Sequence, residues 1–158
     1  MKILMDSDCL IKLTKTGLKE FICKQDEVTI PFVVKKEVVD AVKSKGLPDA
    51  ELVEKNIQKG ILRVTGKKES SASAKGDQAL IETFNRGGYE IIATDDIKLI
   101  KSLKSIGIRF ILPGLLIYSL YQRKGIDKAT GLEWLERLSS YISDDESSMV
   151  RFLLEGQS

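Results

Sequence analysis

The chain has 158 residues, of which 42% are hydrophobic and 30% are charged, and its formal net charge is +2. This mixture is typical of one globular domain with a hydrophobic core, and it excludes a disordered or fibrous protein. Apolar runs are short and interrupted by charges, and the first acid comes at Asp6. We therefore expect no membrane span and no signal peptide, and a cytoplasmic location.

Histidine is absent from the sequence. This excludes Ser-His-Asp and Cys-His catalysis as well as zinc sites with histidine ligands. The two cysteines, Cys9 and Cys23, lie in apolar surroundings and are predicted to be reduced core residues. Any chemistry must then use carboxylates, hydroxyl groups, lysines or a metal ion that carboxylates bind.

Strand-like and helix-like segments alternate along the chain. Strands are predicted at residues 2–5, 28–30, 61–65, 89–94 and 108–112. Apolar residues at helical spacing fill most of the intervening segments, residues 66–73 are predicted to form a loop, and further helices are predicted at 115–123, 129–141 and 147–154. The alternation predicts one α/β domain over residues 1–158, with a mostly parallel sheet between two helical layers and C-terminal helices from about residue 114.

Several acids are placed at one edge of this predicted sheet. Asp6 follows the first strand directly, and Asp95 and Asp96 follow the strand at 89–94. Glu37 and Asp77 lie early in helices that can point back to the same edge. Ligand sites of open α/β sheets form at the carboxyl ends of the strands, so we expect these acids to meet there.

Acids near helix N-termini also have a structural use, because each can stabilise a helix by about 0.5–2 kcal/mol. Several carboxylates at one edge nevertheless repel one another and raise each other's pKa, a cost that bound cations offset. Oxygen ligands favour Mg²⁺ or Mn²⁺, and such a site suits hydrolysis of phosphate esters.

Four segments together resemble the acidic motifs of PIN-domain proteins. They are KILMDSDCLI at 2–11, VVKKEV at 33–38, KGDQAL at 75–80 and IIATDD at 91–96. The resemblance runs from residue 2 to about residue 112. It implies a three-layer α/β/α domain with an acidic Mg²⁺ or Mn²⁺ pocket that hydrolyses single-stranded or structured RNA, as in the toxin of a VapBC-type toxin–antitoxin pair.

The resemblance also implies roles for individual residues. Asp6, Glu37, Asp77 and Asp96 would be catalytic, and the same four with Asp95 would bind the metal. Asp8 and the hydroxyl group of Thr94 would support these ligands. Asp96 fits the Thr-x-Asp pattern of the family, whereas Asp95 lies closer to the strand end, and we expect Asp96 to be the more metal-facing of the two. RNA and an antitoxin protein would be the partners.

Two alternatives start from the same residues. Asp6-Ser7-Asp8 after a strand also resembles the nucleophile and acid of haloacid-dehalogenase-type phosphatases, which form an aspartyl-phosphate, and Gly76-Asp77 resembles their metal-binding pair. The other alternative is a module that binds RNA or a protein without cleavage. Lysines near the acids are compatible with phosphate contacts.

The apolar surface of the predicted C-terminal helices indicates that the protein assembles with further copies of itself. The segments 115–121 and 132–141 contain more apolar surface than one side of a small sheet is expected to cover. Such an excess is common at subunit interfaces, so we expect a homodimer.

Overall fold

The structure is a computed structural model, and it describes residues 1–44, 49–66 and 76–156. Within these residues, five parallel strands form one sheet in the order β3-β2-β1-β4-β5. The central strand β1 pairs with β2 on one side and with β4 on the other. The strands are β1 (Lys2–Met5), β2 (Glu27–Pro31), β3 (Arg63–Thr65), β4 (Ile91–Ala93) and β5 (Phe110–Ile111).

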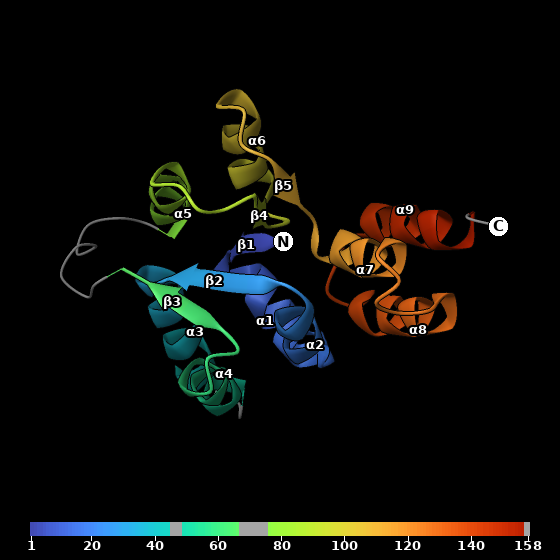
Figure 1. The fold of residues 1–158 in the computed structure, drawn as a ribbon, viewed down its shortest axis with the longest axis horizontal. Coiled ribbons are helices and arrows are strands. Elements are labelled where there is room, and N and C mark those ends of the chain that lie inside the picture. Colours follow the sequence, from blue (N-terminus) through green and yellow to red (C-terminus); the bar gives the residue numbers. More distant parts are fainter. Residues whose placement is uncertain (45–48, 67–75, 157–158) are drawn as a thin grey trace.

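Helices connect the strands and cover both faces of the sheet (Figure 1). The connections from β1 to β2 and from β2 to β3 lie on one face, and α5 and α6 lie on the other (Figure 1). These helices are α1 (Ser7–Thr16), α2 (Leu18–Gln25), α3 (Phe32–Ser44), α4 (Asp49–Gln58), α5 (Gly76–Asn85) and α6 (Ile97–Ser105). The predicted three-layer α/β/α architecture with a parallel sheet is confirmed.

The strands are close to the predicted positions, but two of them are shorter. Residues 89–94 were predicted as a strand, and only Ile91–Ala93 pair as β4. The last predicted strand at 108–112 is reduced to Phe110–Ile111. Single residues beyond the paired segments, Thr94 after β4 and Ile108 before β5, are also buried, so pattern alone overestimates strand length. Most of the predicted loop at 66–73 lies outside the described residues.

The helix α1 shows how local sequence determines an element next to the site. Asp6 caps its N-terminus by accepting a hydrogen bond from the backbone N–H of Cys9. Gly17 ends it with φ of +78°, a conformation that glycine adopts without steric cost. Cys9, Leu10 and Leu13 face the core. Asp6 is thereby held between the end of β1 and the first turn of α1.

Three C-terminal helices form a separate group beside the sheet (Figure 1). They are α7 (Pro113–Gln122), α8 (Lys128–Leu138) and α9 (Asp144–Glu155), and each packs against the other two, while α7 and α8 also contact α1. The last of them begins at residue 144, three residues before the predicted start, because Ser143 caps it.

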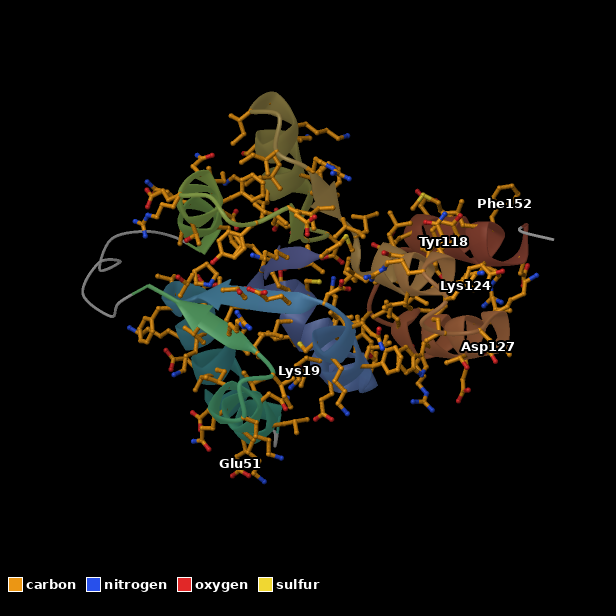
Figure 2. All side chains as sticks on the ribbon, in the orientation of Figure 1. Lys19, Glu51, Tyr118, Lys124, Asp127 and Phe152 are labelled. Atoms are coloured by element: carbon orange, nitrogen blue, oxygen red, sulfur yellow. The ribbon has the colours of Figure 1, made fainter. Side chains whose placement is uncertain are left out.

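The apolar residues of α7 and α8 are mostly buried within the chain itself. Leu116, Ile117 and Leu120 of α7 and Leu135 and Leu138 of α8 belong to the core. The large apolar side chains of this region that remain exposed are Tyr141, Met149 and Phe152, and Phe152 projects outward from α9 (Figure 2). Internal packing therefore uses much of the surface on which the dimer prediction rested, and the homodimer remains a prediction.

Both cysteines are free, with Cys9 buried and Cys23 half-buried, as predicted. Within the described residues, no helix combines the length and the apolar character that a membrane crossing requires.

Candidate functional site

The strand order reverses at β1 and β4, which are neighbours in the sheet. The connections after β1 and β4 leave toward opposite faces of the sheet (Figure 1), and ligand sites of open α/β sheets form at the carboxyl ends of such strands. Asp6 follows β1, and Thr94, Asp95 and Asp96 follow β4. These residues therefore lie at this switch point of the topology.

Asp6 is the most deeply placed of these acids, with 6% of its surface exposed. One carboxylate oxygen, Oδ1, accepts a hydrogen bond of 2.8 Å from the backbone N–H of Cys9. The other, Oδ2, accepts a hydrogen bond from the hydroxyl group of Thr94. Burial raises the pKa of Asp6 to about 7, and the negative charges of Asp8 and Asp95 add to this effect against the two hydrogen bonds.

Thr94 is completely buried and connects two acids of the site. Its hydroxyl group donates to Asp6 and accepts a hydrogen bond of 3.1 Å from the backbone N–H of Asp96. Thr94 is therefore hydrogen-bonded to Asp6, and its support of a metal ligand stays a prediction. The same hydroxyl orients the Asp6 carboxylate and holds the turn that carries Asp96.

Asp95 forms an ion pair with Lys12 of α1. Burial would lower the pKa of Lys12, but the hydrogen bond and the charge of Asp95 outweigh it, so this pKa is raised. Lys12 is therefore fully protonated at neutral pH. It places one positive charge within a cluster of acids.

Asp96 has a different local role. Its Oδ1 accepts a hydrogen bond of 2.8 Å from the backbone N–H of Leu99 and caps α6. Desolvation raises the pKa of Asp77, and the charges of Asp96 and Asp8 raise it further, while Lys98 opposes this. Asp77, Asp96 and Asp8 are thus electrostatic neighbours, although they come from three different helix N-termini.

Glu37 lies against the first residue of α5. A Cβ atom built on Gly76 would be 2.7 Å from Oε1 and 2.9 Å from Oε2 of Glu37. A side chain at position 76 would therefore push the flexible end of Glu37 away from the start of α5. Glu37 is thus placed against the residue that precedes Asp77 in the chain.

The predicted acids lie near the carboxyl ends of the strands, but they do not form a preformed metal-binding site. Among the described residues, no group of three or more acids and cysteines is arranged to hold a metal ion. Protein donors or cations already engage Asp6, Asp95 and Asp96. The donor chemistry nevertheless fits Mg²⁺ or Mn²⁺, because the available ligands are carboxylate and hydroxyl oxygens.

One acid of this region was not predicted from the sequence. Glu146, on the first turn of α9, has 5% of its surface exposed, and its Oε2 accepts a hydrogen bond of 2.8 Å from the backbone N–H of Gly114. Burial raises its pKa, and the charge of Asp95 raises it further, which shows that the two acids are close. In the sequence, Ser143 before three successive acids is typical of a helix N-terminus, but this pattern does not reveal which of the acids is buried.

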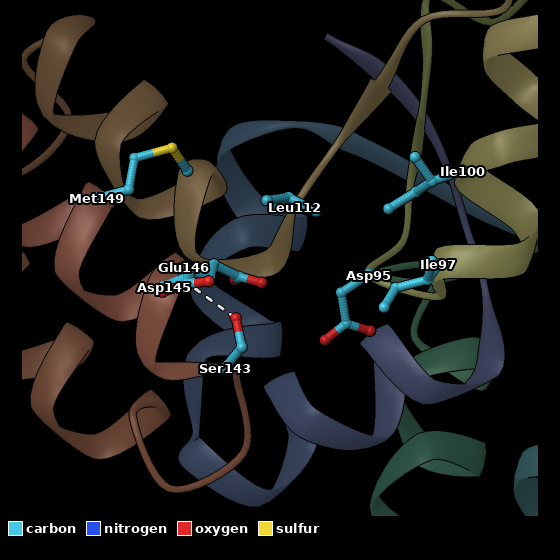
Figure 3. A pocket seen from close by; sticks show the side chains of 8 residues that line it. All are labelled: Asp95, Ile97, Ile100, Leu112, Ser143, Asp145, Glu146 and Met149. Carbon is cyan, nitrogen blue, oxygen red and sulfur yellow. Dashed lines mark hydrogen bonds between the residues drawn. The ribbon is translucent and has the colours of Figure 1, made fainter.

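A pocket of about 370 Å³ lies between α6 and α9 (Figure 3). Ile97 and Ile100 of α6 lie on one side and Met149 of α9 on the other, with Asp95 and Glu146 between them (Figure 3). Leu112, Ser143 and Asp145 complete the lining. Because Asp95 also belongs to the acidic edge, the pocket adjoins the candidate site.

No model of a known protein family matches this chain, and comparison with curated proteins gave no match. The resemblance to PIN domains therefore stays a prediction that rests on the four motifs.

Proposed function

We propose that the protein is a metal-dependent endoribonuclease of PIN-like type, which cleaves phosphodiester bonds in RNA at the carboxyl edge of the sheet. The observation that carries the proposal is the convergence of Asp6, Asp95 and Asp96 at the carboxyl ends of β1 and β4, with Asp77 close enough to Asp96 to feel its charge and Glu37 against Gly76. In this proposal the protein is the toxin of a toxin–antitoxin pair, with an antitoxin protein as its second partner.

The electrostatics of Asp6 support a cation site. Burial raises the pKa of Asp6 to about 7, which means that the charged form of this carboxyl group is destabilised in the metal-free protein. A nearby divalent cation would restore the charged form. The proposed ligands are Asp6, Glu37, Asp77, Asp96 and Asp95.

Mg²⁺ or Mn²⁺ held by these carboxylates would supply positive charge for the phosphate and would lower the pKa of an attacking water. The residues of the chain have their own tasks. Thr94 holds Asp6 in one orientation, and Gly76 leaves room for the carboxylate of Glu37. Lys12 pairs with Asp95 and offsets its negative charge at the edge of the site.

The test is cleavage of a labelled single-stranded RNA by the purified full chain, with Mn²⁺, with Mg²⁺ or with EDTA. We expect cleavage with either metal and none with EDTA. Asp6→Asn should lower the rate by about 10²-fold or more, because a neutral amide is a weak ligand for a hard cation.

Asp127→Asn is the matched control. Asp127 also caps a helix, α8, but it is exposed at the far end of the C-terminal group (Figure 2). This variant should cleave at the wild-type rate. Wild-type cleavage by Asp6→Asn would disprove the proposed site, and a phosphate covalently attached to Asp6 would identify a phosphatase of the haloacid-dehalogenase type instead.

A further inference from the structure

The pocket between α6 and α9 has two apolar walls and a polar base. Ile97 and Ile100 form one wall and Met149 faces them, while the carboxylates of Asp95 and Glu146 lie between the walls (Figure 3). A volume of about 370 Å³ lies within the range of small-ligand sites in proteins. This shape suits a flat ring whose two faces contact the apolar side chains of the walls and whose edge presents hydrogen-bond donors.

Glu146 is fixed in place by the fold. Its Oε2 is bound to the backbone N–H of Gly114, and its own backbone N–H donates to Ser143 Oγ over 3.1 Å (Figure 3). A Cβ atom on Gly114 would lie 3.0 Å from this oxygen and 2.9 Å from Val150 Cγ2, so the close approach of α9 to α7 depends on glycine. A buried carboxylate held in this way is an acceptor of defined position.

The local charge favours a neutral group with N–H donors, such as a nucleobase, over a phosphate, because three acids, Asp95, Asp145 and Glu146, line the pocket. Lys12 pairs with Asp95 and also lowers the cost of charge on Glu146. Asp95 is therefore neutralised by a protein cation, and Glu146 remains as an acceptor of fixed position. Glu146 also lies in the first turn of α9, where the helix dipole favours negative charge.

We propose that this pocket binds one nucleobase of the RNA substrate and selects guanine. Guanine presents two adjacent N–H donor groups, which match Oε1 of Glu146 and the second lone pair of Oε2, whose first lone pair accepts from Gly114, whereas uracil presents one such group. Because Asp95 belongs to both the pocket and the acidic edge, the bound base would belong to a nucleotide near the cleaved bond. This inference rests on the proposed ribonuclease function for its biological meaning, but binding of the base can be measured separately.

The experiment is a titration of the full chain, carrying ¹³C-labelled Ile and Met methyl groups, with neutral nucleosides in EDTA. Guanosine should shift the methyl signals of Ile97, Ile100 and Met149, and uridine should shift them at an affinity about tenfold lower. Glu146→Gln should remove most of this difference, while it can still accept the hydrogen bond from Gly114. Glu155→Gln, exposed on the same helix, should leave it unchanged.

Three outcomes separate the two proposals. Guanosine binding without RNA cleavage in any metal would support the base site and reject only the ribonuclease. Metal-dependent cleavage without any preference for guanine, together with no methyl shifts on addition of guanosine, would reject only the base site. Shifts caused by N-acetyl-arginine amide but not by guanosine would also overturn it, because the pocket would then accept a basic side chain of a protein.

Discussion

The hydroxyl group of Thr94 donates a hydrogen bond to the buried carboxylate of Asp6, across a separation of 88 residues. It joins the ends of β1 and β4, which are neighbouring strands of the sheet. Thr94→Val removes the donor and keeps the shape, so Asp6 Oδ2 loses its partner. We expect the free energy of unfolding to fall by about 1–3 kcal/mol.

Urea denaturation of Thr94→Val and Thr94→Ser measures this effect. The serine variant retains the hydroxyl group and should keep most of the stability that valine loses. Equal stabilities of the two variants would show that the hydrogen bond contributes nothing.

Asp6→Asn should abolish cleavage while the stability of the metal-free protein holds or rises. Burial raises the pKa of Asp6 to about 7, so at pH 8 the folded state contains a buried charge that the unfolded state keeps in water. Removing that charge stabilises the folded state, and this gain offsets the hydrogen bond from Thr94 that an NH₂ group in place of Oδ2 cannot accept. Urea denaturation at pH 8 in EDTA measures the free energy of unfolding; a variant less stable than the wild type would contradict this, and Asp127→Asn should leave stability unchanged.

Gly76→Ala should separate stability from function. The added methyl group would meet the carboxylate of Glu37 at 2.7 Å, and the flexible end of that side chain would have to move. We expect a change in stability within about 1 kcal/mol, because alanine is a good helix former, but a loss of Mn²⁺-dependent cleavage. Undiminished cleavage and unchanged Mn²⁺ affinity, measured by calorimetry, would remove Glu37 from the site.

Asp95 and Asp96 should differ when they are replaced. Asp96→Ala loses the cap of α6 and about 1 kcal/mol of stability, whereas Asp96→Asn can retain the cap. If Asp96 is the more metal-facing acid, Asp96→Asn weakens Mn²⁺ binding more than Asp95→Asn does. Calorimetric titration with Mn²⁺ decides between them, and the reverse order would assign the main role to Asp95.

Asp26 controls acid stability at a distance from the site. Burial would raise the pKa of Asp26, but hydrogen bonds from Arg123, at 2.8 and 2.7 Å, and from the N-terminal amine outweigh it and lower this pKa below 3.8. A group whose pKa is lowered by folding stabilises the protein above its unfolded pKa, and this contribution disappears as pH falls through the folded value.

Asp26→Asn should therefore cost about 1–3 kcal/mol at pH 7, and the cost should shrink below about pH 4. Unfolding curves recorded from pH 2 to 7 test this. A cost that stays constant over that range would show that the charge of Asp26 does not contribute.

The sequence by itself determined the architecture and the acidic edge. Strands predicted at 2–5 and 89–94, in a chain where strands and helices alternate, indicate parallel pairing, and an acid that directly follows a strand emerges at its carboxyl end. For that reason Asp6, Asp95 and Asp96 could be located without coordinates. These are local relationships, set by residues adjacent in the chain.

The tertiary structure decided which distant residues touch. Neighbouring sequence does not show that Lys12 pairs with Asp95, that Gly76 accommodates Glu37, or that Glu146 turns inward to the N–H of Gly114. Each contact depends on how two helices pack against the sheet or against each other. The final position of each carboxylate follows from side-chain packing between segments far apart in the chain, and a periodic pattern carries no information about that packing.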